Sequence, residues 1–186
     1  MIWESEPWKL YITGRIKSLQ RRRFQRRWSG TSFAALEQDI FFSAYAVRKL
    51  VEAYKISDEV EAECIWALSH LPSSGDVDVM NWHRIEEHYD LATSTEVGLT
   101  LRQYCNQIIH SFIFIVTFAE DELLDGFFVA SDFEKKHRLL YFTIEDIVKL
   151  LDKVAEDDIV SLEVRRDQIG GLAKIIRKSK YHKSDN

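Results

Sequence analysis

The 186-residue sequence is poor in residues that interrupt or cross-link a fold. It contains only 7 glycines and 2 prolines, which argues against collagen, low-complexity sequence and a turn-rich all-β sandwich. The 2 cysteines, Cys64 and Cys105, lie alone without a Cys-x-x-Cys pair. Isolated thiols are typical of a reducing compartment. We therefore expect a cytoplasmic protein in which both cysteines are small buried side chains.

Long hydrophobic runs are also missing. The most apolar segment covers residues 108–118 and is interrupted by His110, so it is shorter than the roughly 20 residues that a membrane helix needs. The first residues, Met-Ile-Trp-Glu-Ser-Glu-Pro, lack a basic stretch followed by an apolar one, which predicts no secretory signal. The sequence thus predicts no membrane association.

Several motifs of known chemistry are absent as well. The glycines fit no phosphate-binding loop, and no Gly-x-Ser-x-Gly segment occurs, so nucleotide-binding and serine-hydrolase sites have no support. His83 and His88 could join Cys64 and His70 around a metal only in a fold that their spacing does not predict. The sequence therefore predicts neither a metal site nor a cofactor.

Charge is present but unevenly placed. Hydrophobic residues make up 46% and charged residues 30%, a globular composition rather than a disordered one. The whole chain has a net charge of -5, yet residues 1–27 hold eight basic and two acidic side chains, a balance of +6, which leaves -11 for the rest. Such asymmetry indicates an anionic partner for the basic end.

The basic end contains the run Arg-Arg-Arg-Phe-Gln-Arg-Arg-Trp at residues 21–28. Spaced guanidinium groups neutralise phosphates, and Phe24 or Trp28 could stack on unpaired bases. We take five residues as candidate nucleic-acid ligands: Arg21, Arg22, Arg23, Arg26 and Arg27. In the alternative interpretation both aromatic residues belong to the core. The arginines then pair with acids such as Glu37 and Asp39, or dock on a second copy or on an acidic partner protein.

Hydrophobic spacing predicts a helical bundle over residues 1–112 that carries the basic helix at its N-terminal end. Ser5 and Pro7 mark the start of the first helix, and Ser29-Gly30-Thr31-Ser32 marks its end. Residues 71–81 form the loop that we expect to be most mobile. The later helices are expected at 33–55, about 58–69, 82–89 and about 95–112.

After residue 112 the spacing of hydrophobic residues changes from that of helices to that of strands. Residues 113–186 are expected to form a β-β-α-β-like arrangement within the same compact unit. Its helix is expected to start at Thr143, which caps it. The tail from Lys174 is expected to fray. Strands are expected at 113–118, 126–131, 138–142 and 159–165. The predicted fold class is α+β, mostly a helical bundle followed by a small antiparallel sheet with one helix.

The fourth long helix contains three polar residues on one face. Arg102, Asn106 and His110 are spaced four apart, and residues at that spacing are neighbours on a helix. A histidine titrates near neutral pH and suits proton transfer, so we take these three as candidate catalytic residues. The structural alternative is that Asn106 and His110 hydrogen-bond to each other or to neighbours and fix how the helix packs.

The segment Cys105-Asn106-Gln107-Ile108-Ile109-His110 resembles the motif helix of the HEPN superfamily, and the resemblance covers about residues 33–118. It implies a helical domain that acts as a homodimer and handles RNA, with His110 as acid or base of a metal-independent cleavage and Asn106 beside it. Cys105 stands where cleaving members have arginine. Three functions are therefore weighed: a non-enzymatic module for RNA or a partner protein, a ribonuclease of the toxin or defence type, and a purely structural partner subunit.

Overall fold

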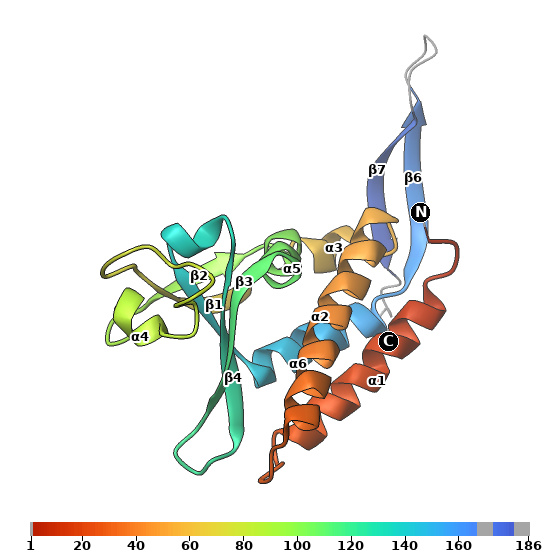
Figure 1. Ribbon diagram of the computed structural model, residues 1–186. Helices are drawn as coiled ribbons and strands as arrows, with labels where there is room; N and C mark the ends of the chain where they lie inside the picture. Colours follow the sequence, from red (N-terminus) through yellow and green to blue (C-terminus); the bar gives the residue numbers. More distant parts are fainter. Residues whose placement is uncertain (1, 167–172, 181–186) are drawn as a thin grey trace.

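The computed structural model describes residues 2–166 and 173–180 and confirms the α+β class (Figure 1). The helices are α1 (Glu6–Arg22), α2 (Gly30–Glu52), α3 (Asp58–Glu61), α4 (Ile85–His88), α5 (Leu101–Ile109) and α6 (Ile144–Glu156), with a 3-10 turn, η1, at Glu134–Lys136. The strands are β1 (Ile65–His70), β2 (Thr95–Leu99), β3 (Ser111–Phe118), β4 (Leu124–Ser131), β5 (Leu139–Thr143), β6 (Ile159–Arg166) and β7 (Ala173–Lys180).

The predicted helical bundle is wrong, because two strands lie inside residues 1–112. The helix expected at 58–69 ends at Glu61, and the one expected at 95–112 is split into β2 and α5. Thr100 separates those two elements, since its hydroxyl accepts from the backbone N–H of Gln103 and the Gln103 side chain accepts in return from Thr100, a capping box that starts a new helix. The sheet is therefore larger than predicted.

The large sheet has five antiparallel strands in the order β2-β1-β5-β4-β3. β1 pairs with β2 and, across the chain, with β5, where Leu68 faces Tyr141. The predicted strands at 113–118, 126–131 and 138–142 are confirmed as β3, β4 and β5, and Thr143 caps α6 as predicted. The pairing of β1 with β5 thus joins segments about 70 residues apart in one sheet.

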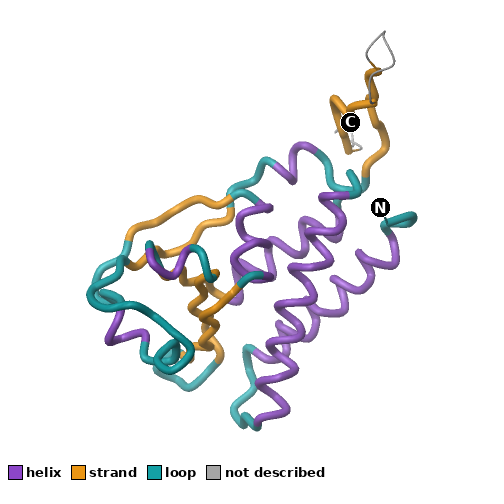
Figure 2. Tube along the Cα trace, turned by 45° about the horizontal axis from the view of Figure 1, so that its top comes forward, coloured by secondary structure: helices purple, strands orange, loops and turns teal. Residues whose placement is uncertain are grey.

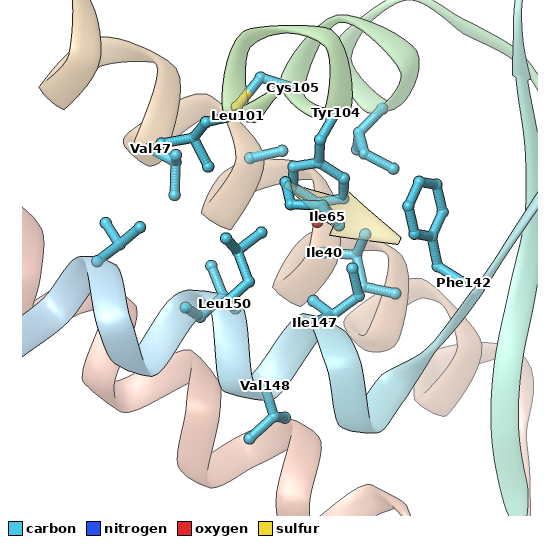
Figure 3. Close-up of a cluster of buried hydrophobic side chains, with 14 of the residues drawn as sticks. Ile40, Val47, Ile65, Leu101, Tyr104, Cys105, Phe142, Ile147, Val148 and Leu150 are labelled. Atoms are coloured by element: carbon cyan, nitrogen blue, oxygen red, sulfur yellow. The ribbon is translucent and has the colours of Figure 1, made fainter. Parts of the chain in front are cut away.

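Helices cover one face of this sheet. Buried side chains from α2, α5 and α6 meet those of the strands in the main core, where Ile40, Tyr104 and Ile147 lie near Ile65 and Phe142 (Figure 3). Alternate residues of a strand point to opposite faces, so Phe127 and Val129 of β4 face the helices. Cys105 and Leu101 of α5 lie in the same core, so that helix is held by its apolar face.

The opposite face is partly covered by the long connection between β1 and β2. Val77, Ile85 and Tyr89 pack there against Ala130 and Leu139 in a second, smaller core. Figure 2 shows this connection beside the strands, away from the long helices. Residues 71–81, expected as a loop, lie in it, and the short helix expected at 82–89 is reduced to α4.

A separate two-stranded ribbon, β6 and β7, extends beyond the helices (Figure 1). The strand expected at 159–165 is confirmed as β6. The expectation of a fraying tail is wrong for β7, because the backbone N–H of Lys178 donates to Asp58 (2.9 Å) and its ammonium contacts Glu61 of α3. Lys183, also counted in that tail, lies outside the described residues.

Candidate functional site

The basic run forms an exposed turn at the end of α1. The helix ends at Arg22, earlier than the stop expected at 29–32, and Ser29 instead caps the start of α2. Residues 21–27, called here the basic turn, are the last two residues of α1 and the segment that leads towards α2. Arg21, Arg26 and Arg27 are exposed, and none of them forms an ion pair within residues 2–166 and 173–180. Phe24 lies between them with 73% of its surface exposed. The turn therefore presents three uncompensated cations and one accessible ring.

The other two arginines of the run are already paired. The Arg22 Nε donates to Asp39 Oδ2 at 3.1 Å, and the Arg23 Nη2 donates to Glu145 Oε2 of α6 at 3.0 Å. Both side chains are less exposed than those of Arg21 and Arg26. The alternative interpretation, in which the run pairs with acids of the same chain, thus holds for these two arginines.

Asp39 is the centre of this pairing. It is only 2% exposed and accepts from Arg15 Nη1 at 2.8 Å and from Ser18 Oγ at 2.6 Å, in addition to Arg22. Glu37, the other acid that the sequence suggested, is exposed and has no ion pair in the described part of the chain. A buried carboxylate needs such partners, because an unpaired buried charge is costly.

Trp28 is not available to a ligand in the way that Phe24 is. Its ring packs against Phe33 and Phe118, with centroids 5.1 and 5.4 Å apart, and its Nε1 donates to the Gln25 carbonyl at 2.9 Å. Phe118 leads directly into the exposed acidic tip of the β3–β4 hairpin, Glu120–Glu122. A polyanion would be repelled there, so the open approach to the basic turn is from the α1 side.

A second surface surrounds His110. Both His110 and Asn106 are exposed and line an open cleft of about 640 Å³ between α2, α5 and the segment around η1. His110 ends α5, and its carbonyl accepts from the backbone N–H of Asp132 at 3.1 Å, which fixes the far wall of the cleft. Neither predicted side chain is sealed in the core, but Asn106 hydrogen-bonds to a neighbouring helix, as the structural alternative expected.

Arg102 does not belong to this cleft. Its Nε donates to Glu61 of α3 at 3.1 Å, which turns it away from Asn106 despite the helical spacing. Arg48 of α2 lies there instead: its Nη1 donates to Asn106 Oδ1 at 2.7 Å and its Nε to Glu52 at 2.7 Å. Sequence reasoning missed Arg48 as a cleft residue, because it lies 58 positions from Asn106 and no local pattern links them.

The charges in the cleft are largely compensated. Hydrogen bonds from Lys49 and Arg48 lower the pKa of Glu52 to about 2, so this acid stays ionised beside Arg48. On the opposite wall the Arg138 Nε donates to Glu134 at 2.7 Å. The cleft therefore offers an accessible imidazole and carboxamide, but its two guanidinium groups are both held by carboxylates.

Cys105, at the position of the missing arginine, points away from the cleft. It is fully buried, and burial raises the pKa of its thiol to about 12, so no reactive thiolate forms. A long charged side chain at this position would enter the core. The expectation of two buried cysteines is correct for Cys105 and wrong for Cys64, which is exposed.

The described residues contain no cluster of three or more side chains that could hold a metal ion. His70 and His88 instead contact separate backbone carbonyls, His70 those of Asp90 and Thr93 and His88 that of Ser74. Within the same part of the chain no helix has the length and apolar character to cross a bilayer. Comparison with known proteins finds no family model, no curated protein and no solved structure that matches this chain.

Proposed function

We propose that this protein is a non-enzymatic binding module that takes single-stranded RNA on the basic turn. The observation that carries the proposal is that Arg21, Arg26 and Arg27 are exposed without an ion-pair partner in the described chain, with Phe24 open between them. Arginines of this kind release counterions from phosphates, and an exposed ring stacks on unpaired bases. Since the chain as a whole is acidic, this local charge is not a general property of the surface.

The proposal is tested by the fluorescence anisotropy of a labelled single-stranded RNA at salt concentrations from about 0.05 to about 0.2 M. Replacing Arg21, Arg26 and Arg27 by alanine should weaken binding about tenfold and lower the slope of log affinity against log salt by about 2, at about 0.7 per lost phosphate contact. Phe24→Ala should weaken binding without changing that slope, because stacking carries no counterions.

A matched control removes the same number of charges elsewhere, by replacing Lys55, Lys136 and Lys174 with alanine; none of the three has an ion pair in the described part of the chain. It should leave the salt slope within error of the wild type. Equal losses in both triple variants would mean that only net charge matters and would contradict a site at the basic turn. If RNA does not bind at all, an acidic protein partner or a purely structural subunit becomes the better explanation of the same arginines.

The second candidate function is a metal-independent ribonuclease, favoured by the exposure of His110 and Asn106 in one cleft. A general acid or base contributes about 10²–10⁴-fold to a rate. Labelled RNA incubated with the protein in EDTA should then be cleaved, and His110→Ala should abolish cleavage. His137→Ala, an exposed histidine outside the cleft, is the control. Cleavage that survives His110→Ala would contradict a catalytic role for His110.

A HEPN-like ancestry, a homodimer and a cytoplasmic location stay predictions of the sequence and complete this proposal. The unpaired thiols of Cys64 and Cys105 support a reducing compartment. Sedimentation equilibrium of the full chain tests the homodimer: a single species at the monomer mass over the whole concentration range would contradict it.

A further inference from the structure

A pocket between α1 and α2 shares Arg21 and Arg22 with the basic turn, and neither candidate function uses the rest of its lining. Its volume is about 340 Å³, within the usual range of small-molecule sites. The residues that line it come from the second half of α1 and the first half of α2. They are Gly14, Arg15, Lys17, Ser18, Arg21, Arg22, Ala35, Gln38 and Asp39.

The pocket is strongly positive. Four cationic side chains line it, and Asp39 is the one acid among the lining residues. That carboxylate already accepts hydrogen bonds from Arg15, Arg22 and Ser18. It therefore holds the two guanidinium groups in place and does not neutralise the other cations of the pocket. Lys17 and Arg21 have no ion pair in the described part of the chain.

One donor of a lining residue is left without a partner, below the surface of the pocket. The Nε of Arg15 is buried and makes no hydrogen bond, although the Nη1 of the same group reaches Asp39. Gln38, whose side-chain amide can donate as well as accept, is exposed at the rim. Guanidinium groups that a carboxylate holds in place, next to two unpaired cations, are an arrangement that binds an oxyanion through charge-assisted hydrogen bonds.

We propose that this pocket binds the terminal phosphate of the RNA strand that crosses the basic turn. Arg21 lies in both the turn and the pocket, so the two surfaces are continuous through this side chain and a strand on the turn can end in the pocket. A terminal phosphomonoester carries close to two negative charges at neutral pH, whereas an internal phosphodiester carries one, and the excess of cations favours the former. The identity of the strand rests on the proposed function, but the phosphate site itself does not.

The experiment compares three versions of one RNA sequence: with a 5′-phosphate, with a 3′-phosphate, and with hydroxyl groups at both ends. One phosphorylated version should bind the wild-type protein about tenfold more tightly than the hydroxyl version, which corresponds to about 1.4 kcal/mol. Which end is preferred gives the direction of the strand.

Two variants remove the site without touching the Asp39 pairing. A side chain at Gly14 meets nothing within 4 Å of its Cβ, so Gly14→Glu can fold and places an acid in the pocket. Lys17→Gln removes an unpaired cation. Both should abolish the preference for the phosphorylated end. Gln20→Glu, on an exposed position of the same helix outside the pocket, adds a negative charge and should keep the preference.

Equal affinity of the wild type for all three RNAs would overturn the phosphate site while leaving RNA binding at the basic turn intact. If no RNA binds, the proposed function is contradicted. The phosphate site is then tested with inorganic phosphate alone, by NMR. Phosphate-dependent NMR shifts at Lys17 and Gln38 that Gly14→Glu abolishes would retain a phosphate site. Absence of those shifts would overturn it.

Discussion

Gly126 of β4 lies against the neighbouring strand β5 without room for a side chain. A Cβ at this position would overlap the Phe142 carbonyl oxygen and lie 2.6 Å from the Tyr141 hydroxyl. That hydroxyl donates to Asp125, so the tyrosine is held over the glycine. The absence of a side chain is therefore required by packing here, in a strand that is otherwise rich in aromatic and β-branched residues.

Gly126→Ala should lower the free energy of unfolding by about 1–3 kcal/mol, because an inserted methyl group forces backbone and ring apart. Urea unfolding followed by circular dichroism measures the change. Gly98→Ala in β2 is the control: its Cβ would lie 3.5 Å from Cys64 and Trp66, an ordinary contact, so the change should stay within about 0.5 kcal/mol. Equal changes in the free energy of unfolding for both substitutions would contradict the requirement for a missing side chain at Gly126, because loss of glycine entropy alone stabilises the fold.

At the scale of elements, the pair α1 and α2 is held by a polar joint as well as by apolar packing. Ile12, Ile16 and Leu19 form the buried apolar stripe of α1. Asp39 of α2 forms ion pairs with Arg15 and Arg22 of α1. Hydrophobic contacts are not directional. We infer that the carboxylate sets the register of the two helices, and the adjoining phosphate pocket depends on that register.

Asp39→Ala should destabilise the fold by about 3 kcal/mol, since it leaves the mostly buried Arg22, 13% exposed, without its partner. Glu37→Ala, two residues earlier and exposed, should change stability by less than about 0.5 kcal/mol. Urea unfolding of both variants gives the comparison. A loss below about 1 kcal/mol for Asp39→Ala would mean that Arg22 finds solvent or another acid, and that the joint is dispensable.

At the scale of the whole molecule, stability should fall at both ends of the pH range. On the acid side, hydrogen bonds from Lys49 and Arg48 lower the pKa of Glu52 to about 2 from an ordinary value of 4.5. A hydrogen bond from Thr93 lowers the pKa of Asp90, and a hydrogen bond from Lys149 lowers the pKa of Glu145. These acids stabilise the fold while ionised, so their contribution is complete above about pH 4.5 and is lost as the pH falls towards 2.

On the alkaline side, burial raises the pKa of Tyr89 and of Tyr141 to about 12 from 10.0. The folded state holds these protons more tightly than the unfolded state, so their contribution is complete below about pH 10 and is lost as the pH rises towards 12. Urea midpoints measured from pH 2 to pH 12 should show a plateau between these limits. Tyr89→Phe should reduce the alkaline fall, and an unchanged alkaline limb in that variant would contradict the assignment.

The elements predicted correctly are those whose signals are local. Thr143 starts α6 because its hydroxyl accepts from the backbone N–H of Asp146 three residues on, and β3 is a continuous run of β-branched and aromatic residues from Phe112 to Phe118. The errors at 58–69 and 95–112 have a different cause. Residues 65–70 read Ile-Trp-Ala-Leu-Ser-His, and this composition is compatible with a helix or a strand. The segment forms a strand because its backbone pairs with β5, which is distant in the sequence.

By itself the sequence determined the α+β class, the excess of positive charge at the N-terminal end and the helix that begins at Thr143, because composition and contacts within a few residues decide these features. Only the tertiary structure decided which arginines stay free. Arg22 and Arg23 pair with Asp39 and Glu145, which lie 17 and 122 residues away, while Arg21, Arg26 and Arg27 have no ion-pair partner in the described chain. Such pairing depends on how the helices pack, and spacing along the chain does not encode it.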